Sequence, residues 1–397
     1  MEKLAMNGGT PVRDTKLFYG HQYIDEADIQ AVTDVLRSDY LTCGPKITEL
    51  EAKLCELTGA KYAVVCSNDT AALHIACMAA GVAPGDEVIT TPITFLASAN
   101  CAVYCGGTPV FADIDEHTYN IDPAEIQKKV TPKTKAIVAV DYTGQVVDLD
   151  AIMDICEKNN IVLIEDAAHS IGTKYNGKPV GSIAHMTTFS FHPVKTVTAG
   201  EGGAVLTDDP ELYRKLCLYR SHGMTRDESQ MTKPSEGGWY YQMIDIGYNY
   251  RMTDMQAALL ISQLNKLPMF SKRRKEIVAR YNEAFSQMPE IIVQEELPAS
   301  DSTRHLYILR LNEDKLSIDR KAFFEAMEAE NIYCNVHYIP VYLQPFYQER
   351  GYKAGLCPKA EALYKDMMSL PLYYAMNDQD VEDVIHAVKK IVENYRK

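Results

Sequence analysis

The stretch Ser190-Phe191-His192-Pro193-Val194-Lys195 places a lysine just past a β-type run that covers residues 186–191. Upstream of it, the apolar run 161–164 leads directly into Glu165-Asp166-Ala167-Ala168-His169. In an α/β sheet, ligands bind in the crevice beyond the carboxyl ends of the strands. An acid at the end of one buried strand and a lysine just past another therefore predict a ligand held between them.

Lys195 and Asp166 together have the chemistry that pyridoxal phosphate requires. Partial burial and an adjacent cofactor cation lower a lysine pKa, so that a neutral amine is available to form a Schiff base. A carboxylate keeps the pyridine nitrogen protonated, which makes the ring an electron sink. We therefore predict that Lys195 carries the cofactor and that Asp166 supports its ring. Taken singly, a solvated lysine and a salt-bridged aspartate are the alternatives.

The stretch Ser67-Asn68-Asp69-Thr70-Ala71-Ala72-Leu73 lies between a predicted strand (62–66) and a predicted helix (70–80). Backbone N–H groups at a helix N-terminus favour an anion, so this junction is a candidate phosphate site. Helix capping by Asn68, Asp69 or Thr70 is the alternative. Phe95 follows another predicted strand, where it could stack on a flat ring or pack in the core.

Length, charge and composition exclude several classes of protein. A chain of 397 residues is long enough for two domains, and its net charge of −14 argues against a nucleic-acid partner. No signal peptide is visible at the start, and no apolar run reaches the ~20 residues of a membrane span. The ten cysteines form no C-x-x-C pair, which predicts buried free thiols in the cytoplasm and no metal site.

Alternating apolar strands and helices between residues 62 and 220 predict a mostly parallel sheet with helices on both faces. Residues 224–246 are expected to form a long loop, and a helix over 254–267 is expected to end at Pro268. Beyond a helix over 272–288, shorter strands and helices follow, including a strand over 333–337. We expect a large domain with an N-terminal arm (1–268) and a smaller α+β domain (269–397).

In chain order, seven motifs resemble the sugar-nucleotide aminotransferases of the DegT type, within the fold type I pyridoxal phosphate enzymes. They are S-N-D-T-A-A-L (67–73), T-P-I-T-F (91–95), E-D-A-A-H (165–169), S-F-H-P-V-K (190–195), E-G-G-A-V (201–205), R-S-H-G-M (220–224) and G-Y-N-Y-R (247–251). The resemblance runs from Tyr19 to the C-terminus. S-F-H-P-V-K-T (190–196), L-T-C-G (41–44) and V-H-Y-I-P-V-Y (336–342) resemble more narrowly the transaminases of pseudaminic acid biosynthesis.

The resemblance implies a role for each matching residue. Lys195 and Asp166 would be catalytic, and Phe95 would stack on the ring. Groups that hold the cofactor phosphate would be Thr70, Ala71, Ser190 and, from the other subunit of a homodimer, Asn249. The sugar-nucleotide site would be lined by Tyr19, Tyr40, Leu41, Thr42, Asp69, His337 and Tyr338.

The resemblance also implies a reaction. L-glutamate would give its amino group to the cofactor, leaving 2-oxoglutarate and pyridoxamine phosphate. A UDP-linked 4-keto-6-deoxy sugar would then become a 4-amino sugar, as in the formation of UDP-4-amino-4,6-dideoxy-N-acetyl-β-L-altrosamine. Another 4-keto or a 3-keto sugar is the first alternative. A deoxysugar dehydratase, in which histidine replaces the lysine, and a non-catalytic regulator are the others.

Two departures from the resemblance bear on the site. Asp69 stands where relatives usually have Gly or Ala, and a carboxylate beside a phosphate is unfavourable unless it points away or contacts substrate. Ala71 stands where some relatives have Ser, so only its N–H group could contact the phosphate. The loop around Trp239 also looks longer than in close relatives, and a substrate lid or an insertion without a role would explain it.

Overall fold

The computed structural model describes residues 2–397, so the first residue of the predicted large domain lies outside it. A seven-stranded sheet forms the centre, in the order β2-β10-β9-β6-β5-β3-β4. Only β10 runs antiparallel to its neighbours, which confirms the predicted, mostly parallel sheet. The strands are β2 (Tyr62–Cys66), β3 (Glu87–Thr90), β4 (Thr108–Phe111), β5 (Thr134–Val140), β6 (Val162–Asp166), β9 (Met186–Ser190) and β10 (Gly203–Thr207).

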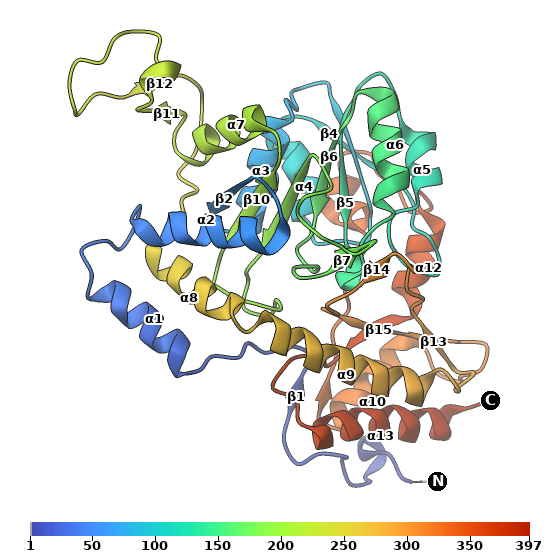
Figure 1. The fold of residues 1–397 in the computed structure, drawn as a ribbon. Coiled ribbons are helices and arrows are strands. Elements are labelled where there is room, and N and C mark those ends of the chain that lie inside the picture. Colours follow the sequence, from blue (N-terminus) through green and yellow to red (C-terminus); the bar gives the residue numbers. More distant parts are fainter. Residues whose placement is uncertain (1) are drawn as a thin grey trace.

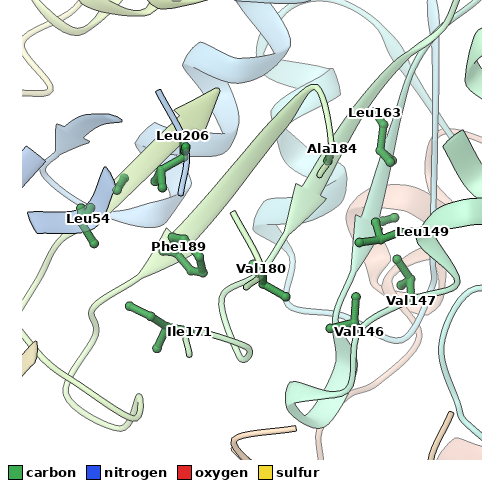
Figure 2. Close-up of a cluster of buried hydrophobic side chains, with 14 of the residues drawn as sticks. Leu54, Val146, Val147, Leu149, Leu163, Ile171, Val180, Ala184, Phe189 and Leu206 are labelled. Atoms are coloured by element: carbon green, nitrogen blue, oxygen red, sulfur yellow. The ribbon is translucent and has the colours of Figure 1, made fainter. Parts of the chain in front are cut away.

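Helices cover both faces of this sheet, because its strands carry apolar side chains on both sides. One face packs on α2 and α6, and Figure 2 shows Phe189, Leu163 and Leu206 of the strands gathered with Leu54 and Leu149 of these helices. The other face packs on α3, α4 and α7. The helices of this part are α1 (Glu26–Leu36), α2 (Pro45–Thr58), α3 (Asp69–Ala79), α4 (Ala97–Tyr104), α5 (Pro123–Lys129), α6 (Leu149–Asn159), α7 (Pro210–Arg220) and α8 (Asp254–Leu264).

The C-terminal part has its own buried cluster, built on an antiparallel sheet in the order β13-β15-β17. The long helix α9 leads into it from the central sheet (Figure 1). Strand β17 escaped prediction, because Met-Met-Ser-Leu lacks β-branched residues. The elements are α9 (Leu267–Phe285), β13 (Ile291–Val293), β15 (Tyr307–Leu311), α10 (Arg320–Ala329), β16 (Ile332–Tyr333), α11 (Pro345–Gln348), α12 (Pro358–Asp366), β17 (Met367–Leu370) and α13 (Asp378–Tyr395).

The N-terminal segment packs on this C-terminal part. Leu4 and Leu17 belong to its buried cluster, and β1 (Leu17–Phe18) pairs in parallel with β16. Carboxylate oxygens of the buried Glu330 accept hydrogen bonds from the Ala5 and Val12 N–H groups, both at 2.9 Å. The division at residue 268 stays a prediction, and we propose that residues 2–18 be counted with the smaller domain.

Three predicted segments differ in the structure. Helix α8 ends at Leu264, and Pro268 lies in the first turn of α9, where a missing N–H group costs no hydrogen bond. The expected loop 224–246 contains a projecting hairpin of β11 (Met224–Thr225) and β12 (Gln242–Met243) (Figure 1). The strand expected over 333–337 stops at Tyr333, and the irregular segment after it contributes to the cavity described below.

The ten cysteines are all free. Most are buried or half-buried, as expected from their apolar surroundings, but Cys43 is exposed in the turn before α2. Among residues 2–397, no cluster of His, Cys, Asp and Glu side chains is suited to a metal ion. The described helices include none that is both long and apolar enough to cross a bilayer.

Candidate active site

A cavity of about 1110 Å³ opens at the carboxyl ends of the central strands. The topology brings its walls together, because β2, β3, β6 and β9 all end at this edge of the sheet. Most of the residues that we expected at the site line it: Tyr19, Asp69, Thr70, Ala71, Phe95, Asp166, Ser190, Lys195, His337 and Tyr338. Their individual roles stay predictions.

Lys195 lies in a tight turn beyond β9, where its N–H group donates to the His192 carbonyl at 2.9 Å. The turn is anchored on both sides by the fully buried Phe191 and Val197. Burial lowers the pKa of Lys195 to about 8, and the facing carboxyl groups of Asp69 and Asp166 limit this decrease. The lysine therefore has an amine that is partly neutral near physiological pH, as imine chemistry requires.

Asp166 is the last residue of β6, and only 3% of its surface is exposed. The Ser98 hydroxyl donates to Oδ2 at 2.6 Å, and the Ala168 N–H group donates to Oδ1 at 3.2 Å. Burial raises the pKa of Asp166, whereas these hydrogen bonds and Lys195 lower it. The carboxylate is thus fixed in orientation at the base of the cavity, ready for a cationic partner.

The N-terminus of α3 forms another wall of the cavity. The first N–H groups of a helix have no partner within it, and Asp69 and Thr70 hold these positions. The Ala71 N–H group instead donates to Asn68 Oδ1 at 2.8 Å, so capping and phosphate binding compete for this donor. A Cβ atom on Gly203 would lie 2.5 Å from the Asn68 carbonyl carbon, so only glycine lets β10 approach this turn.

Asp69 points into the molecule, toward Lys195 and Asp166, and away from bulk solvent. Its Oδ1 atom is buried and has no hydrogen-bond partner. Burial raises the pKa of Asp69 well above the usual value, nearby Asp166 raises it further, and Lys195 opposes both. The carboxyl group that the sequence places beside a phosphate is therefore directed toward the lysine, which opposes the rise in its pKa.

Neutral histidines and tyrosines form the wall on the side of the smaller domain. The Tyr338 hydroxyl lies 3.3 Å from His169 Nε2, and the centroids of the His169 and His305 rings lie 4.5 Å apart, with the rings tilted by 41°. Burial lowers the pKa of both histidines well below the usual value and that of His337 to about 4. The Tyr19 ring lies 5.1 Å from that of His337. This wall offers hydrogen bonds without positive charge.

Four expected site residues do not line the cavity of their own chain. Tyr40, Leu41 and Thr42 lie in the exposed segment before α2, where the Asp254 N–H group donates to the Leu41 carbonyl at 3.0 Å. Asn249 is exposed, although its neighbours Tyr248 and Tyr250 both line the cavity. Alternate residues of an extended segment face opposite sides, so Asn249 points outward from this chain.

Several lining residues were missed by sequence reasoning. Ser98 follows Thr94 by four residues, about one helical turn, and their hydroxyl oxygens lie 2.7 Å apart. A search of the sequence for polar residues one turn after the T-P-I-T-F motif would have found Ser98. His305 lies in the irregular segment just before β15, far away in sequence, and left no local signal. Asp69, Asp166 and Glu201 give the cavity three carboxyl groups against the single lysine, Lys195.

The arrangement fits pyridoxal phosphate. Lys195 could provide the amine, Asp166 a carboxylate for the ring nitrogen, and the start of α3 with Ser190 the donors for the phosphate. Phe95, which is 59% exposed, projects into the cavity mouth and offers a free ring face. The cavity is also far larger than the cofactor alone requires, which leaves room for an organic substrate.

Comparison with known proteins identifies the family. Residues 22–389 match the model of the DegT/DnrJ/EryC1/StrS aminotransferase family. The chain is 44% identical over 382 residues to the spore coat polysaccharide biosynthesis protein SpsC of Bacillus subtilis, covering 96% of this chain and 98% of SpsC.

Two solved structures are closely similar. PseC of Helicobacter pylori, an aminotransferase involved in the biosynthesis of pseudoaminic acid, has a TM-score of 0.89 and 34% identity, covering 96% of this chain and all of PseC. The pyridoxal phosphate (PLP) form of the putative sugar aminotransferase Spr1654 from Streptococcus pneumoniae has a TM-score of 0.89 and 33% identity. The match covers 96% of this chain and 99% of the Spr1654 chain. These findings confirm the predicted fold class, aminotransferase activity and cofactor. The chain belongs to the DegT/DnrJ/EryC1/StrS family of PLP-dependent sugar aminotransferases.

Proposed function

We propose that this chain transfers the amino group of L-glutamate to C4 of a UDP-linked 4-keto-6-deoxy sugar, in a pathway of the pseudaminic acid type. The observation that carries the aminotransfer chemistry is Lys195 beside Asp166 in one large cavity. The choice of sugar is supported by the similarity to PseC and by the motifs at 190–196 and 336–342. The buried free thiols favour a reducing compartment such as the cytoplasm.

Lys195 is the group that moves the protons of the reaction. With a pKa near 8, its amine can accept a proton from Cα of glutamate and, once protonated, can return a proton to a neighbouring carbon. When bound, PLP supplies a protonated ring that withdraws electrons from the reacting carbon. Asp166 keeps that ring protonated, and its bond from Ser98 holds the carboxylate in place.

The sugar nucleotide is expected to lie along the histidine and tyrosine wall. Tyr338, oriented by His169, can donate a hydrogen bond to a hydroxyl or keto oxygen of a sugar. His337 lies beside it, with its ring nitrogens directed to Ser369 and Asn335. Tyr19 offers an apolar ring face beside them. These contacts recognise a polar, ring-shaped substrate and leave the choice of carbon to its orientation in the cavity.

The absorbance of the bound cofactor during the reaction is the measurement that tests this proposal. L-glutamate should bleach the yellow protein and release 2-oxoglutarate, and the colour should return only with the correct ketosugar, as ping-pong kinetics requires. UDP-linked 4-keto-6-deoxy and 3-keto sugars are compared, and NMR of the product assigns the aminated carbon. Recovery of colour with the 3-keto sugar alone would contradict the proposed substrate, and a lack of bleaching with glutamate would contradict the proposed donor.

A different ketosugar of a surface polysaccharide is the second candidate. SpsC is named for spore coat polysaccharide biosynthesis, and its identity to this chain is 44%, against 34% for PseC. The catalytic residues would be unchanged, because only the walls of the cavity select the sugar. Repeating the recolouring assay with dTDP-linked ketosugars separates the two candidates.

We also propose that the active enzyme is a homodimer with shared sites. The cofactor phosphate, glutamate and a nucleotide diphosphate are all anions, yet three carboxyl groups and one lysine line the cavity of a single chain. Further cationic or amide groups must balance this charge. The exposed Asn249 and the neighbouring Arg251 lie next to the cavity and are suited to reach the site of a second subunit.

Mixing two inactive variants tests the shared site. In a mixed dimer, Lys195→Ala of one chain and Asn249→Ala of the other fall in the same site, so the second site stays intact. Random exchange of subunits should restore about a quarter of the activity of the wild type. In the matched control, Lys195→Ala mixed with Asp166→Ala should show no recovery, because both residues serve the site of their own chain. A monomer in light scattering, or no rescue in the first mixture, would contradict the shared site.

A further inference from the structure

A second cavity, of about 750 Å³, opens at the outer edge of the central sheet beside strand β4. Its volume lies within the range of about 300–1,000 Å³ that is typical of small-molecule sites. It shares no lining residue with the active-site cavity. Helix α4 separates the two, since Val103 lines the outer cavity whereas Ala97 and Ser98 line the active site. The outer cavity is therefore a distinct site.

The charge of the outer cavity is opposite to that of the whole chain. Lys129, Arg350 and Lys353 line it, and no Asp or Glu does. Within residues 2–397, none of these three side chains forms an ion pair. In a protein of net charge −14, three cations without carboxylate partners around one cavity are a concentrated positive field. Such a field favours an anionic ligand.

The remaining wall is aromatic and apolar. The Phe111 ring lies 5.5 Å from that of Tyr352 and 5.9 Å from that of Tyr347, edge-on in both pairs. Phe111 and Tyr347 are fully buried and support the wall, whereas the half-buried Tyr352 forms its accessible aromatic surface. Leu356, 38% exposed, extends this surface at the rim. A bare inorganic anion would leave most of this surface and most of the volume unused. The wall suits a ligand with a flat organic ring.

An added peptide strand is a poor occupant, although β4 is an edge strand. The N–H groups of Thr108 and Ala112 are used by β3, since they donate to Asp86 and Thr90 carbonyls. Between them, Pro109 has no N–H group, and its carbonyl accepts a hydrogen bond from the Tyr352 hydroxyl at 2.5 Å. Pro109 therefore interrupts the row of donors and acceptors that strand addition requires along this edge.

We propose that the outer cavity binds an organic phosphate that carries a flat ring, such as a nucleotide. The phosphate lies among Lys129, Arg350 and Lys353, and the ring lies against Tyr352 and Leu356. Arg350 is already held at the rim, because its guanidinium stacks 3.5 Å over the Phe346 ring and donates to the Phe346 carbonyl at 3.1 Å. Its remaining N–H groups are free for a phosphate.

Calorimetric titration of the PLP-loaded protein with adenosine monophosphate at low salt tests this site. We expect saturable binding in the wild type and a loss of affinity of about tenfold or more in K129A/R350A/K353A, because charge-assisted hydrogen bonds are removed. Ala354→Trp keeps all three cations but fills the cavity, and it should lose affinity as well. Inorganic phosphate, the second probe, should bind more weakly than the nucleotide.

The matched control removes three exposed lysines elsewhere, as K174A/K178A/K389A, with the same change in net charge. Its affinity should equal that of the wild type, and all variants should keep the cofactor absorbance of a folded enzyme. Three results would overturn the proposal: no saturable binding by the wild type, an equal loss of affinity in the control, or equal affinity for inorganic phosphate and the nucleotide.

Discussion

Replacing Lys195 by alanine is expected to abolish aminotransfer, lowering kcat by about 10⁴-fold or more, because the proton-moving group and the covalent attachment of the cofactor are lost together. Among residues 2–397 of one chain, no other lysine lines the cavity, so no second amine of that chain can replace it. Borohydride reduction and mass spectrometry provide the direct measurement. The wild type should retain a PLP adduct on the peptide that contains Lys195, and the variant should retain none.

Lys195→Arg is the control for charge, since it keeps a cation at this position but cannot serve as the amine. It should be as inactive as Lys195→Ala while its thermal stability stays close to that of the wild type. The surface variant Lys174→Ala should keep full activity and the adduct. Turnover at the wild-type rate in Lys195→Ala would refute the central assignment of this site.

Replacing Asp166 by alanine is expected to lower kcat/KM by about 10²–10³-fold, the usual cost of removing a preorganised charged group from an active site. Without the carboxylate, the pyridine nitrogen loses its proton and the ring withdraws electrons poorly. Asp166→Asn, which keeps the shape but not the charge, should lose a similar amount. The measurements are steady-state kinetics and the pH dependence of the cofactor absorption band, which should change in both variants.

Ser98→Ala separates positioning from charge. It removes the 2.6 Å hydrogen bond to Asp166 Oδ2 but leaves the carboxylate in place. One hydrogen bond to a charged group contributes about 1.5–3 kcal/mol, so the loss of activity should be about tenfold to a hundredfold. If Asp166→Asn kept wild-type kinetics and spectra, the ring-supporting role of Asp166 would be wrong.

The local pattern of the sequence predicted the central sheet closely. Strand Tyr62–Cys66 has the bounds expected from its apolar residues, and α3 (Asp69–Ala79) differs by one residue at each end from the helix expected over 70–80. Prediction was weakest where local preference and tertiary context disagree. Pro268 was expected to end a helix, but it lies in the first turn of α9. Locally, a proline is compatible both with the end of one helix and with the start of the next.

The site was predicted as a set of stretches, each at the end of a strand. The structure brings Asp166, Lys195 and Thr70 to one cavity because parallel strands place their carboxyl ends at one edge, while the roles of these residues stay predictions. Ser98 and His305 were missed for the opposite reason. Their contacts depend on how α4 and the smaller domain pack on that edge, and sequence spacing does not encode this packing.

The sequence by itself determined the fold class, the cofactor chemistry and the lysine–aspartate pair, because strand-end motifs and hydrophobic periodicity are local properties of the chain. Only the tertiary structure decided that Asp69 points inward to Lys195, that Asn249 faces outward, and that unpaired cations surround a second cavity beside β4. These features arise where segments distant in sequence meet, since the burial and charge of a side chain are set by neighbours that the sequence order does not reveal.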